Sequence, residues 1–193
     1  MLRLHSRTPE TWAQRLLPHV EELLVEQAHL EKKAASAALT FVFRYPDHPG
    51  LHRALSAAAR EELEHFERTL ALLERRGLEA RRLAPGPYAE RLLAVVRPRE
   101  PERMLDQMLC NSVIEARSCE RMKLLAGALD GRDAELAGFW GDLWRSEARH
   151  HALWIGLALQ VFDAAVVDER LEQILAHEAA VLERATGTPR LHD

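Results

Sequence analysis

The stretch LSAAAREELEHFERTLALL, residues 55–73, decides how the rest of the chain is interpreted. Its apolar residues recur every three or four positions, which is the period of an α-helix with one buried face. Glu62 and His65, three residues apart, interrupt that apolar face. A carboxylate in a protein core is costly unless it is paired or binds a metal ion. The stretch therefore predicts a core helix that brings a Glu-x-x-His pair to a buried polar site.

A lone Glu-x-x-His pair is common on solvated helices, but this chain repeats the pair in a second apolar stripe. In the helix predicted over residues 133–162 the interruption is Glu147 and His150. Two other predicted helices each carry one carboxylate on the apolar face, Glu31 in the first and Glu115 in the third. Each half of the chain thus contains a Glu followed by a Glu-x-x-His pair.

The spacing within the two halves is nearly the same. Glu31 precedes Glu62 by 31 residues, and Glu115 precedes Glu147 by 32. Two similar hairpins about a pseudo-twofold axis would bring these side chains together in mid-bundle. Four carboxylates and two imidazoles suit two iron or manganese ions, as in ferritin-like di-metal proteins. The predicted metal ligands are Glu31, Glu62, His65, Glu115, Glu147 and His150.

Two alternatives to this ligand set remain open at the level of sequence. Glu61 and Glu64 flank Glu62, and His151 follows His150, so a local shift of register is conceivable. Only the Glu62/His65 and Glu147/His150 pairs have the same spacing while lying on the apolar stripe. The other alternative is a buried polar network that binds no metal.

The fold that these patterns predict is an all-α, ferritin-like four-helix bundle with a di-metal site in the bundle core and extra flanking helices. Two helical hairpins are joined by a longer crossover, a connectivity that ferritin-like bundles use. We expect a single domain over residues 1–193 and no strands. The four long helices are predicted at 18–44, 51–76, 102–129 and 133–162, a short helix follows Pro9, and further helices are predicted at 88–96 and 164–185.

Composition limits the classes of partner and compartment. The net charge of -4 argues against a protein that coats nucleic acid, yet residues 75–103 hold eight arginines against four glutamates. Cys110 and Cys119 lie nine residues apart on one predicted helix, about 13 Å, so they cannot form a disulfide with each other. No apolar stretch is long enough to span a bilayer. We therefore expect a cytoplasmic protein with no membrane partner.

Five stretches resemble one bacterial enzyme family. They are HLEKKAASAAL (29–39), YPDHPGL (45–51), REELEHFERTLALLERRG (60–77), IEARSCERMKLLA (114–126) and SEARHHALWIGLA (146–158). They are similar to the tRNA-(2-methylthio-isopentenyl-adenosine) hydroxylases of the MiaE type, and the resemblance covers nearly the whole chain. It implies an O2-dependent non-haem di-iron monooxygenase that hydroxylates the isopentenyl group of this adenosine, which lies next to the anticodon of tRNA.

The resemblance also implies cofactors and partners. The six predicted ligands match the ligand positions of the family, which hold two iron ions, with O2 as co-substrate. Electrons would come from an external donor, such as an unidentified reductase, and the substrate would be the anticodon loop of tRNA. The protein is expected to be a monomer or a small oligomer. Candidate tRNA contacts are Lys32, Lys33, Arg75, Arg76, Arg81, Arg82, Arg97, Arg99 and Arg103.

Two competing functions share parts of this pattern. A ferritin-like ferroxidase or a peroxide-handling di-metal protein would use the same six ligands, although a rubrerythrin would usually add a Cys-x-x-Cys iron domain, which this sequence lacks. A non-enzymatic helical interaction module would use the Glu and His residues only as a buried polar network.

Overall fold

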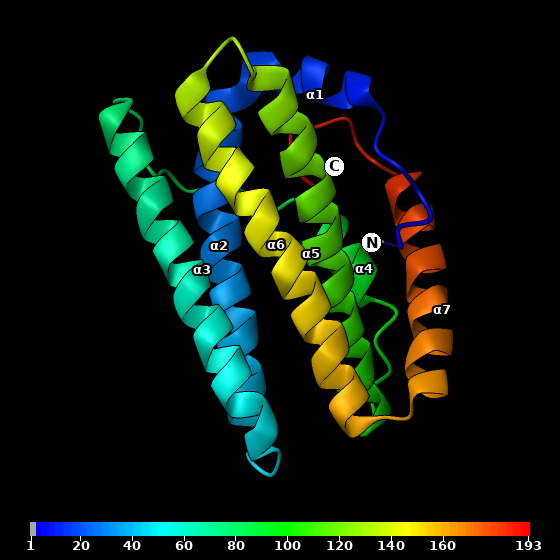
Figure 1. The fold of residues 1–193 in the computed structure, drawn as a ribbon. Coiled ribbons are helices and arrows are strands. Elements are labelled where there is room, and N and C mark those ends of the chain that lie inside the picture. The colour runs from blue at the N-terminus through cyan, green and yellow to red at the C-terminus, as the bar shows by residue number, and fades with distance from the viewer. Residues whose placement is uncertain (1–2) are drawn as a thin grey trace. The chain divides into compact units, whose positions relative to one another are not determined.

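The structure is a computed structural model that describes residues 3–193, and within this range it is helical, with no strand. The sequence predicts the long helices to within two or three residues at each end. The helices are α1 (Glu10–Leu16), α2 (Val20–Arg44), α3 (Pro49–Arg75), α4 (Tyr88–Leu93), α5 (Glu102–Leu129), α6 (Ala134–Val161) and α7 (Ala164–Leu182), and a 3-10 turn (Leu17–His19) precedes α2 (Figure 1).

The described chain divides into two compact units. One unit covers residues 19–85 and contains the hairpin of α2 and α3. The other combines residues 3–18 with 86–193 and contains the hairpin of α5 and α6 together with α1, α4 and α7. Each hairpin holds one of the two Glu and Glu-x-x-His sets.

The turn between α2 and α3 is built from aromatic and proline residues. Tyr45 is buried at the end of α2, and its ring centroid lies 5.2 Å from that of Phe41. The carbonyl of Tyr45 accepts hydrogen bonds from the backbone N–H of His48 at 3.1 Å and from Nε2 of His52 at 3.0 Å. Helix α3 then begins at Pro49 rather than at residue 51, because proline suits the first turn of a helix, where its missing N–H has no partner to lose.

The turn between α5 and α6 uses a glycine. Gly131 has φ +73°, a left-handed conformation that glycine adopts without steric cost. Asp133 then caps α6 by accepting a hydrogen bond from the backbone N–H of Leu136 at 3.0 Å. This tight turn at Asp130–Gly131, between the helices predicted at 102–129 and 133–162, makes α5 and α6 antiparallel neighbours (Figure 1).

Helix α5 is anchored by two ion-pair networks, each centred on a buried carboxylate, Asp106 or Glu178. Asp106 accepts three hydrogen bonds from Arg97 and two from Arg170, at 2.7–2.9 Å. Arg117 donates from Nε and from one terminal nitrogen to the Glu178 carboxylate at 2.8 and 2.9 Å, and Tyr88 donates to the same carboxylate at 3.1 Å. These bonds tie α5 to α7 and to the segment that follows α4, and Tyr88 of α4 shares the Glu178 carboxylate.

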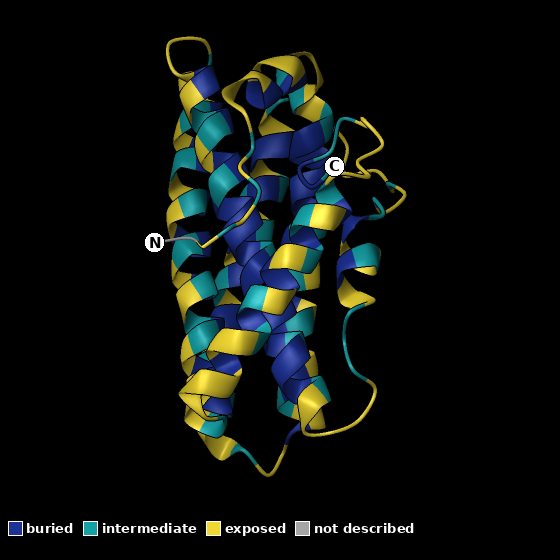
Figure 2. Cartoon of the chain, turned by 90° about the vertical axis from the view of Figure 1, so that its right-hand side faces the viewer, coloured by how far each residue is buried: buried dark blue, intermediate teal, exposed yellow. Residues whose placement is uncertain are grey.

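The apolar stripes predicted from the sequence are buried. Leu55, Ala58 and Leu73 of α3 and Trp140 and Leu143 of α6 are all buried. In the helices of Figure 2 the buried residues gather on one side and the exposed residues on the other. The carboxylates and imidazoles that interrupt the stripes are therefore buried with them.

Two further expectations concern the cysteines and the membrane. Cys110 and Cys119 are both buried free thiols, as the spacing predicts. Burial raises their pKa to about 12 and about 11, so the thiol form persists at neutral pH. From residue 3 to the C-terminus, no helix combines the length and apolar composition that a bilayer crossing requires.

Candidate metal centre

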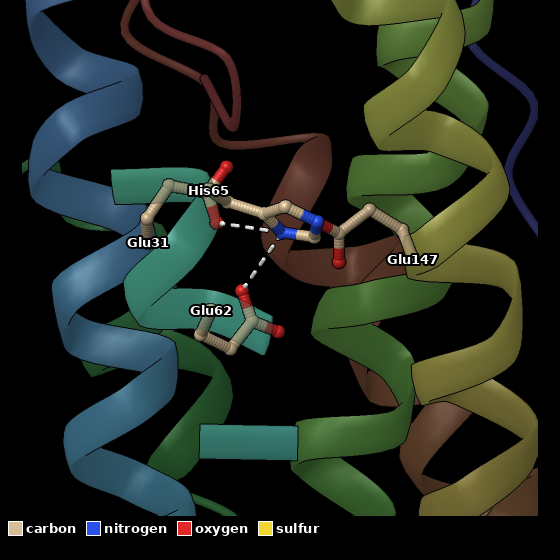
Figure 3. Close-up of side chains that lie close together, drawn as sticks. All are labelled: Glu31, Glu62, His65 and Glu147. Carbon is tan, nitrogen blue, oxygen red and sulfur yellow. Dashed lines mark ion pairs between the residues drawn. The ribbon is translucent and has the colours of Figure 1, made fainter. Parts of the chain in front are cut away.

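The α2–α3 hairpin brings three of the predicted ligands together. Glu31, Glu62 and His65 are 2–4% exposed, and one ligand atom of each lies within 4.8 Å of the others. Nδ1 of His65 lies 3.7 Å from Oε2 of Glu31 and 3.6 Å from Oε2 of Glu62, as Figure 3 shows. These distances exceed ordinary hydrogen bonds. They match the separation of about 3–4 Å between atoms that each lie about 2 Å from one metal ion.

A neighbouring amide holds the carboxylate of Glu31. Nε2 of Gln27, a buried residue one helical turn earlier, donates to Oε1 of Glu31 at 2.7 Å. The bond occupies Oε1, while Oε2 is the oxygen that faces His65. Groups that orient a ligand in this way restrict its rotamer and raise metal affinity. The sequence shows Gln27 on the same helix face as Glu31, and the structure gives it this positioning contact.

The pKa values of Glu31 and His65 are shifted because these ionisable side chains are buried close together. Burial raises the pKa of Glu31 to about 8; Glu62 adds to the rise and His65 opposes it. Burial alone would lower the pKa of His65, but its pairing with Glu31 and Glu62 outweighs this and raises the pKa to about 9. Two buried carboxylates thus favour a positive charge between them, which a divalent metal ion can supply.

The α5–α6 hairpin contains the matching set. Glu115, Glu147 and His150 are 3–8% exposed, and a ligand atom of each lies within 4.8 Å of the others. Glu147 and His150 lie one turn apart on α6, and Glu115 projects from α5. Both hairpins therefore combine two buried carboxylates and one buried imidazole, a donor set that suits iron or manganese better than calcium or copper.

The flanking residues do not share these surroundings. Glu64 is exposed, and the side chain of Glu61 is 35% exposed, with Oε1 at 4.0 Å from Nε2 of His65, on the other ring nitrogen from the one that faces Glu31 and Glu62. The ring of His151 meets Ser112, whose hydroxyl and carbonyl oxygens lie 2.8 and 3.0 Å from Nδ1. Burial lowers the pKa of His151. The geometry therefore favours Glu62 with His65, and Glu147 with His150, over the shifted registers.

A large groove lies on the unit that contains α5 and α6. Its volume is about 1410 Å³, and the N-terminal segment, α5, α6 and α7 contribute to its lining. Trp144 stands in the groove wall with Lys123 and Arg145 on its ring, 5.4 and 4.9 Å from the ring centroid. Cys119 and His151 also line the groove, so it lies against the helical turns next to Glu115 and His150.

The candidate tRNA contacts fall into two groups. Lys32, Lys33, Arg75, Arg81, Arg82 and Arg99 are exposed, whereas Arg76 and Arg103 are half-buried. Arg97 donates three hydrogen bonds to Asp106. Because this pairing holds the guanidinium on the protein, we leave Arg97 out of the proposed tRNA surface.

Sequence reasoning missed the anchors of α5, Asp106 and Arg117, whose charges suggest a solvated helix face.

Comparison with known proteins gives consistent results. A family model described as "tRNA-(MS[2]IO[6]A)-hydroxylase (MiaE)" matches residues 2–193. A Pseudomonas putida protein named tRNA 2-(methylsulfanyl)-N(6)-isopentenyladenosine(37) hydroxylase is 37% identical over 185 residues, which cover 96% of this chain and 89% of that protein. A Salmonella typhimurium protein of the same name is 30% identical over 207 residues, with 82% of this chain and 76% of that protein covered.

A solved structure gives the fold. It is described as "Protein 43 with aldehyde deformylating oxygenase activity from Synechococcus", and it is 42% identical to this chain. The TM-score is 0.92, with 98% of this chain and 95% of that chain covered. Together with the all-helical structure, this likeness confirms the predicted all-α, ferritin-like fold class. Because the family model matches nearly the full length, the chain belongs to the MiaE family of tRNA hydroxylases.

Proposed function

We propose that this chain hydroxylates the isopentenyl group of 2-methylthio-isopentenyl-adenosine next to the anticodon of tRNA, as an O2-dependent non-haem di-iron monooxygenase. The observation that carries the proposal is the family match over residues 2–193, supported by the named hydroxylase that is 37% identical over 96% of the chain. Neither the family nor these relatives are named as ferroxidases or peroxide-handling proteins, so the comparisons do not favour that alternative.

The proposed cofactor is a pair of iron ions held by both hairpins. Each hairpin supplies two buried carboxylates and one buried imidazole. The number of residues between the lone Glu and the Glu-x-x-His pair is nearly the same in the two hairpins. We propose that the hairpins close into one four-helix bundle, a single domain over residues 1–193, in which Glu31, Glu62, His65, Glu115, Glu147 and His150 share the two ions.

The chemistry is a two-electron oxygenation. One oxygen atom of O2 enters a C–H bond of the prenyl tail, and the other leaves as water after two electrons and two protons are supplied. Iron supplies the activation of O2 when it is bound. The electrons must come from a donor outside this chain. The chain's own part is to hold the ligands, through contacts such as that of Gln27 with Glu31, and to surround them with apolar stripes that exclude water.

The substrate places demands on the surface. An unpaired base can be turned out of an RNA loop and read by a protein, while cations hold the phosphates. We propose that exposed and half-buried cations on α2, at the end of α3 and in residues 76–103 bind the tRNA backbone. We further propose a cytoplasmic protein that is a monomer or a small oligomer. The proposed tRNA contacts are Lys32, Lys33, Arg75, Arg76, Arg81, Arg82, Arg99 and Arg103.

Mass spectrometry of nucleosides tests the function directly. The protein is loaded with Fe(II) and incubated with prenylated tRNA, O2 and a chemical reductant, and the tRNA is then digested. We expect the prenylated adenosine to gain one oxygen atom, and 18O2 to label it. A long-chain aldehyde serves as the parallel substrate, because the solved relative is named for aldehyde deformylation. Aldehyde turnover without any change in the tRNA would contradict the proposal.

A further inference from the structure

Helix α2 ends with an aromatic side chain that stands in solvent. Phe43 is 82% exposed, the highest value among the large exposed hydrophobic residues of the described chain. Leu39, one helical turn earlier, is 39% exposed. Isolated exposed apolar residues are ordinary. A phenylalanine that is almost wholly exposed on a regular helix, with a leucine beside it, is a larger apolar surface than folding alone explains.

The backbone that carries Phe43 is fixed on both sides. Phe41 is 4% exposed and Tyr45 is 8% exposed, and their rings lie 5.2 Å apart between centroids. The carbonyl of Tyr45 is held by the hydrogen bonds from His48 and His52 described above. The ring of Phe43 is therefore presented from a rigid element, which lowers the entropy lost when a partner binds it.

Cations accompany this aromatic side chain along the helix. Lys32, Ser36, Leu39 and Phe43 follow one another by four, three and four residues, so they lie on one face of α2. Lys33 and Arg44, both exposed, are the chain neighbours of the first and last of these residues. Residues 32–60 hold five lysines and arginines against one acidic residue, in a chain whose net charge is -4.

An exposed aromatic ring among cations is the arrangement with which proteins bind single-stranded nucleic acid. The cations follow the phosphates, and the ring stacks on a base, which needs an unpaired nucleotide. Val166 on α7 is an exposed apolar residue that can be compared with Phe43: it is 49% exposed, and two acidic residues, Asp163 and Glu169, and one cation, Arg170, lie three or four positions away along the chain. Charge complementarity therefore selects a polyanion for the face that carries Phe43.

We propose that Phe43 is a stacking platform for an unpaired nucleotide of the tRNA loop, with Arg44 on an adjacent phosphate and Lys32 and Lys33 on phosphates further along the RNA. This inference rests on the proposed function and deepens it, because it assigns the recognition of an unpaired loop nucleotide to a particular side chain. Glu31 lies on the same helix, twelve residues before Phe43, which is about 18 Å at the helical rise. The stacked nucleotide is therefore a different nucleotide of the loop and not the modified adenosine itself.

The test measures binding of a fluorescent prenylated anticodon stem-loop to the full chain. The Phe43→Ala variant should bind about 5- to 100-fold more weakly, which corresponds to the loss of one base–aromatic stack. Phe43→Trp should restore the affinity, whereas Phe43→Leu, which keeps apolar area without a π face, should not. Val166→Ala is the matched control for removing an exposed apolar side chain and should bind like the wild type.

Two further readouts distinguish base stacking from charge attraction and from self-association. On a fully paired RNA duplex, Phe43→Ala should bind as the wild type does. The dependence of log Kd on log salt should be unchanged in Phe43→Ala but shallower in Arg81→Glu, since only the second change removes a cation. Wild-type affinity of Phe43→Ala for the stem-loop would overturn the inference. So would a change in sedimentation with concentration that Phe43→Ala abolishes, because Phe43 would then bind a second copy.

The failure of this inference can be told apart from the failure of the proposed function. If wild-type protein hydroxylates the prenylated adenosine and Phe43→Ala binds the stem-loop equally well, only the stacking platform is wrong. If the wild type neither binds the stem-loop nor adds oxygen to it, the proposed substrate is wrong and the platform falls with it.

Discussion

The α2–α3 and α5–α6 hairpins carry the same ligand pattern but differ in what else they bury. In the α2–α3 hairpin the buried ionisable side chains are the predicted ligands Glu31, Glu62 and His65 and one further carboxylate, Glu26. Helix α5 buries Glu115 and, in addition, Asp106, Arg117 and Arg121. Helix α5 therefore has two functional faces, one that supplies a ligand and one that fastens the helix to its own unit.

The residues of α5 that hold the helix in its unit are therefore different from the residue that supplies a predicted metal ligand. Arg117 and Asp106 bind partners on α7, Glu178 and Arg170, which belong to the same unit as α5. The α2–α3 unit contains no third long helix, so its support within the unit comes from the contact of the two helices and from the buried turn. Loss of an equivalent ligand should therefore affect the two hairpins alike, whereas loss of a supporting ion pair should affect only the unit that contains α5.

The largest effect is expected when equivalent ligands are removed. Glu31→Ala and Glu115→Ala should each lower product formation by more than about 100-fold, because losing a ligand should exceed the 10- to 100-fold cost of losing an outer contact. Each should also lower the iron bound per chain. Single-turnover nucleoside mass spectrometry and iron analysis measure the two effects. Glu64→Ala, at an exposed neighbour on α3, is the control and should keep full turnover. Full turnover in only one of the two ligand variants would mean that the hairpins do not contribute equivalent ligands.

The second prediction concerns the support that α5 alone possesses. The Arg117 and Glu178 side chains are both 0% exposed, so Arg117→Ala leaves a buried carboxylate without its main partner. We expect a loss of about 3–5 kcal/mol in the free energy of unfolding, measured by urea denaturation. The double variant Arg117→Met, Glu178→Leu should recover part of the loss, since the fully buried Glu178 carboxylate is removed together with its partner, while Glu120 still loses its ion pair with Arg117.

A surface ion pair in the same unit provides the control. Arg3→Ala removes contacts with Asp168 and Glu172, whose side chains are 65% and 44% exposed, and it should leave the unfolding midpoint nearly unchanged. If Arg117→Ala behaves like Arg3→Ala, the second face of α5 is not an anchor and the contrast between the hairpins disappears.

The third prediction is that the contribution of Asp106 to the free energy of unfolding depends on pH. Burial alone would raise the pKa of Asp106, but hydrogen bonds from Arg97 and Arg170 outweigh it and hold the pKa below its usual value. The stabilisation is therefore complete above the unfolded-state pKa of about 3.9 and is lost as the pH falls through the folded-state pKa. Asp106→Asn should be about 2–3 kcal/mol less stable than the wild type at pH 7, and the gap should narrow below about pH 4.

Urea midpoints measured across this pH range test the sign. Asp168→Asn, at an exposed ion pair, should show little difference from the wild type at any pH. A gap between Asp106→Asn and the wild type that stays constant from pH 7 to pH 3 would mean that Asp106 acts through shape and not through its charge.

The ligand face of each hairpin could be predicted from the sequence because helical periodicity exposes it. A Glu or His at a position where the helical period places apolar residues is conspicuous, and its position marks the site. Gly77, the residue after the helix predicted at 51–76, has φ +67°, and the N–H of Leu78 bonds the carbonyl of Leu73 at 2.9 Å, as a glycine-terminated helix requires. These are local signals, which a sequence contains in full.

The second face of α5 also leaves a signal in the sequence, but an ambiguous one. Asp106, Arg117 and Arg121 are spaced by eleven and four residues, which puts them on one side of a helix. Charged residues at helical spacing usually form a solvated face, so the pattern does not suggest burial. Their partners lie 61 residues away for Arg117 and 64 for Asp106, and no local rule specifies such pairings.

The smallest effect tests how the two hairpins turn. Gly131 has φ +73° between α5 and α6, whereas the 45–48 turn contains no residue with positive φ. A Cβ at Gly131 would meet no atom within 4 Å, so Gly131→Ala should lose only the left-handed backbone energy, about 1–2 kcal/mol. Gly138→Ala, inside α6 with equally open surroundings, should instead gain up to about 1 kcal/mol from helix propensity. Opposite shifts in the thermal midpoint would attribute the effect to φ alone; equal shifts would mean that alanine acts at both sites through something other than backbone conformation.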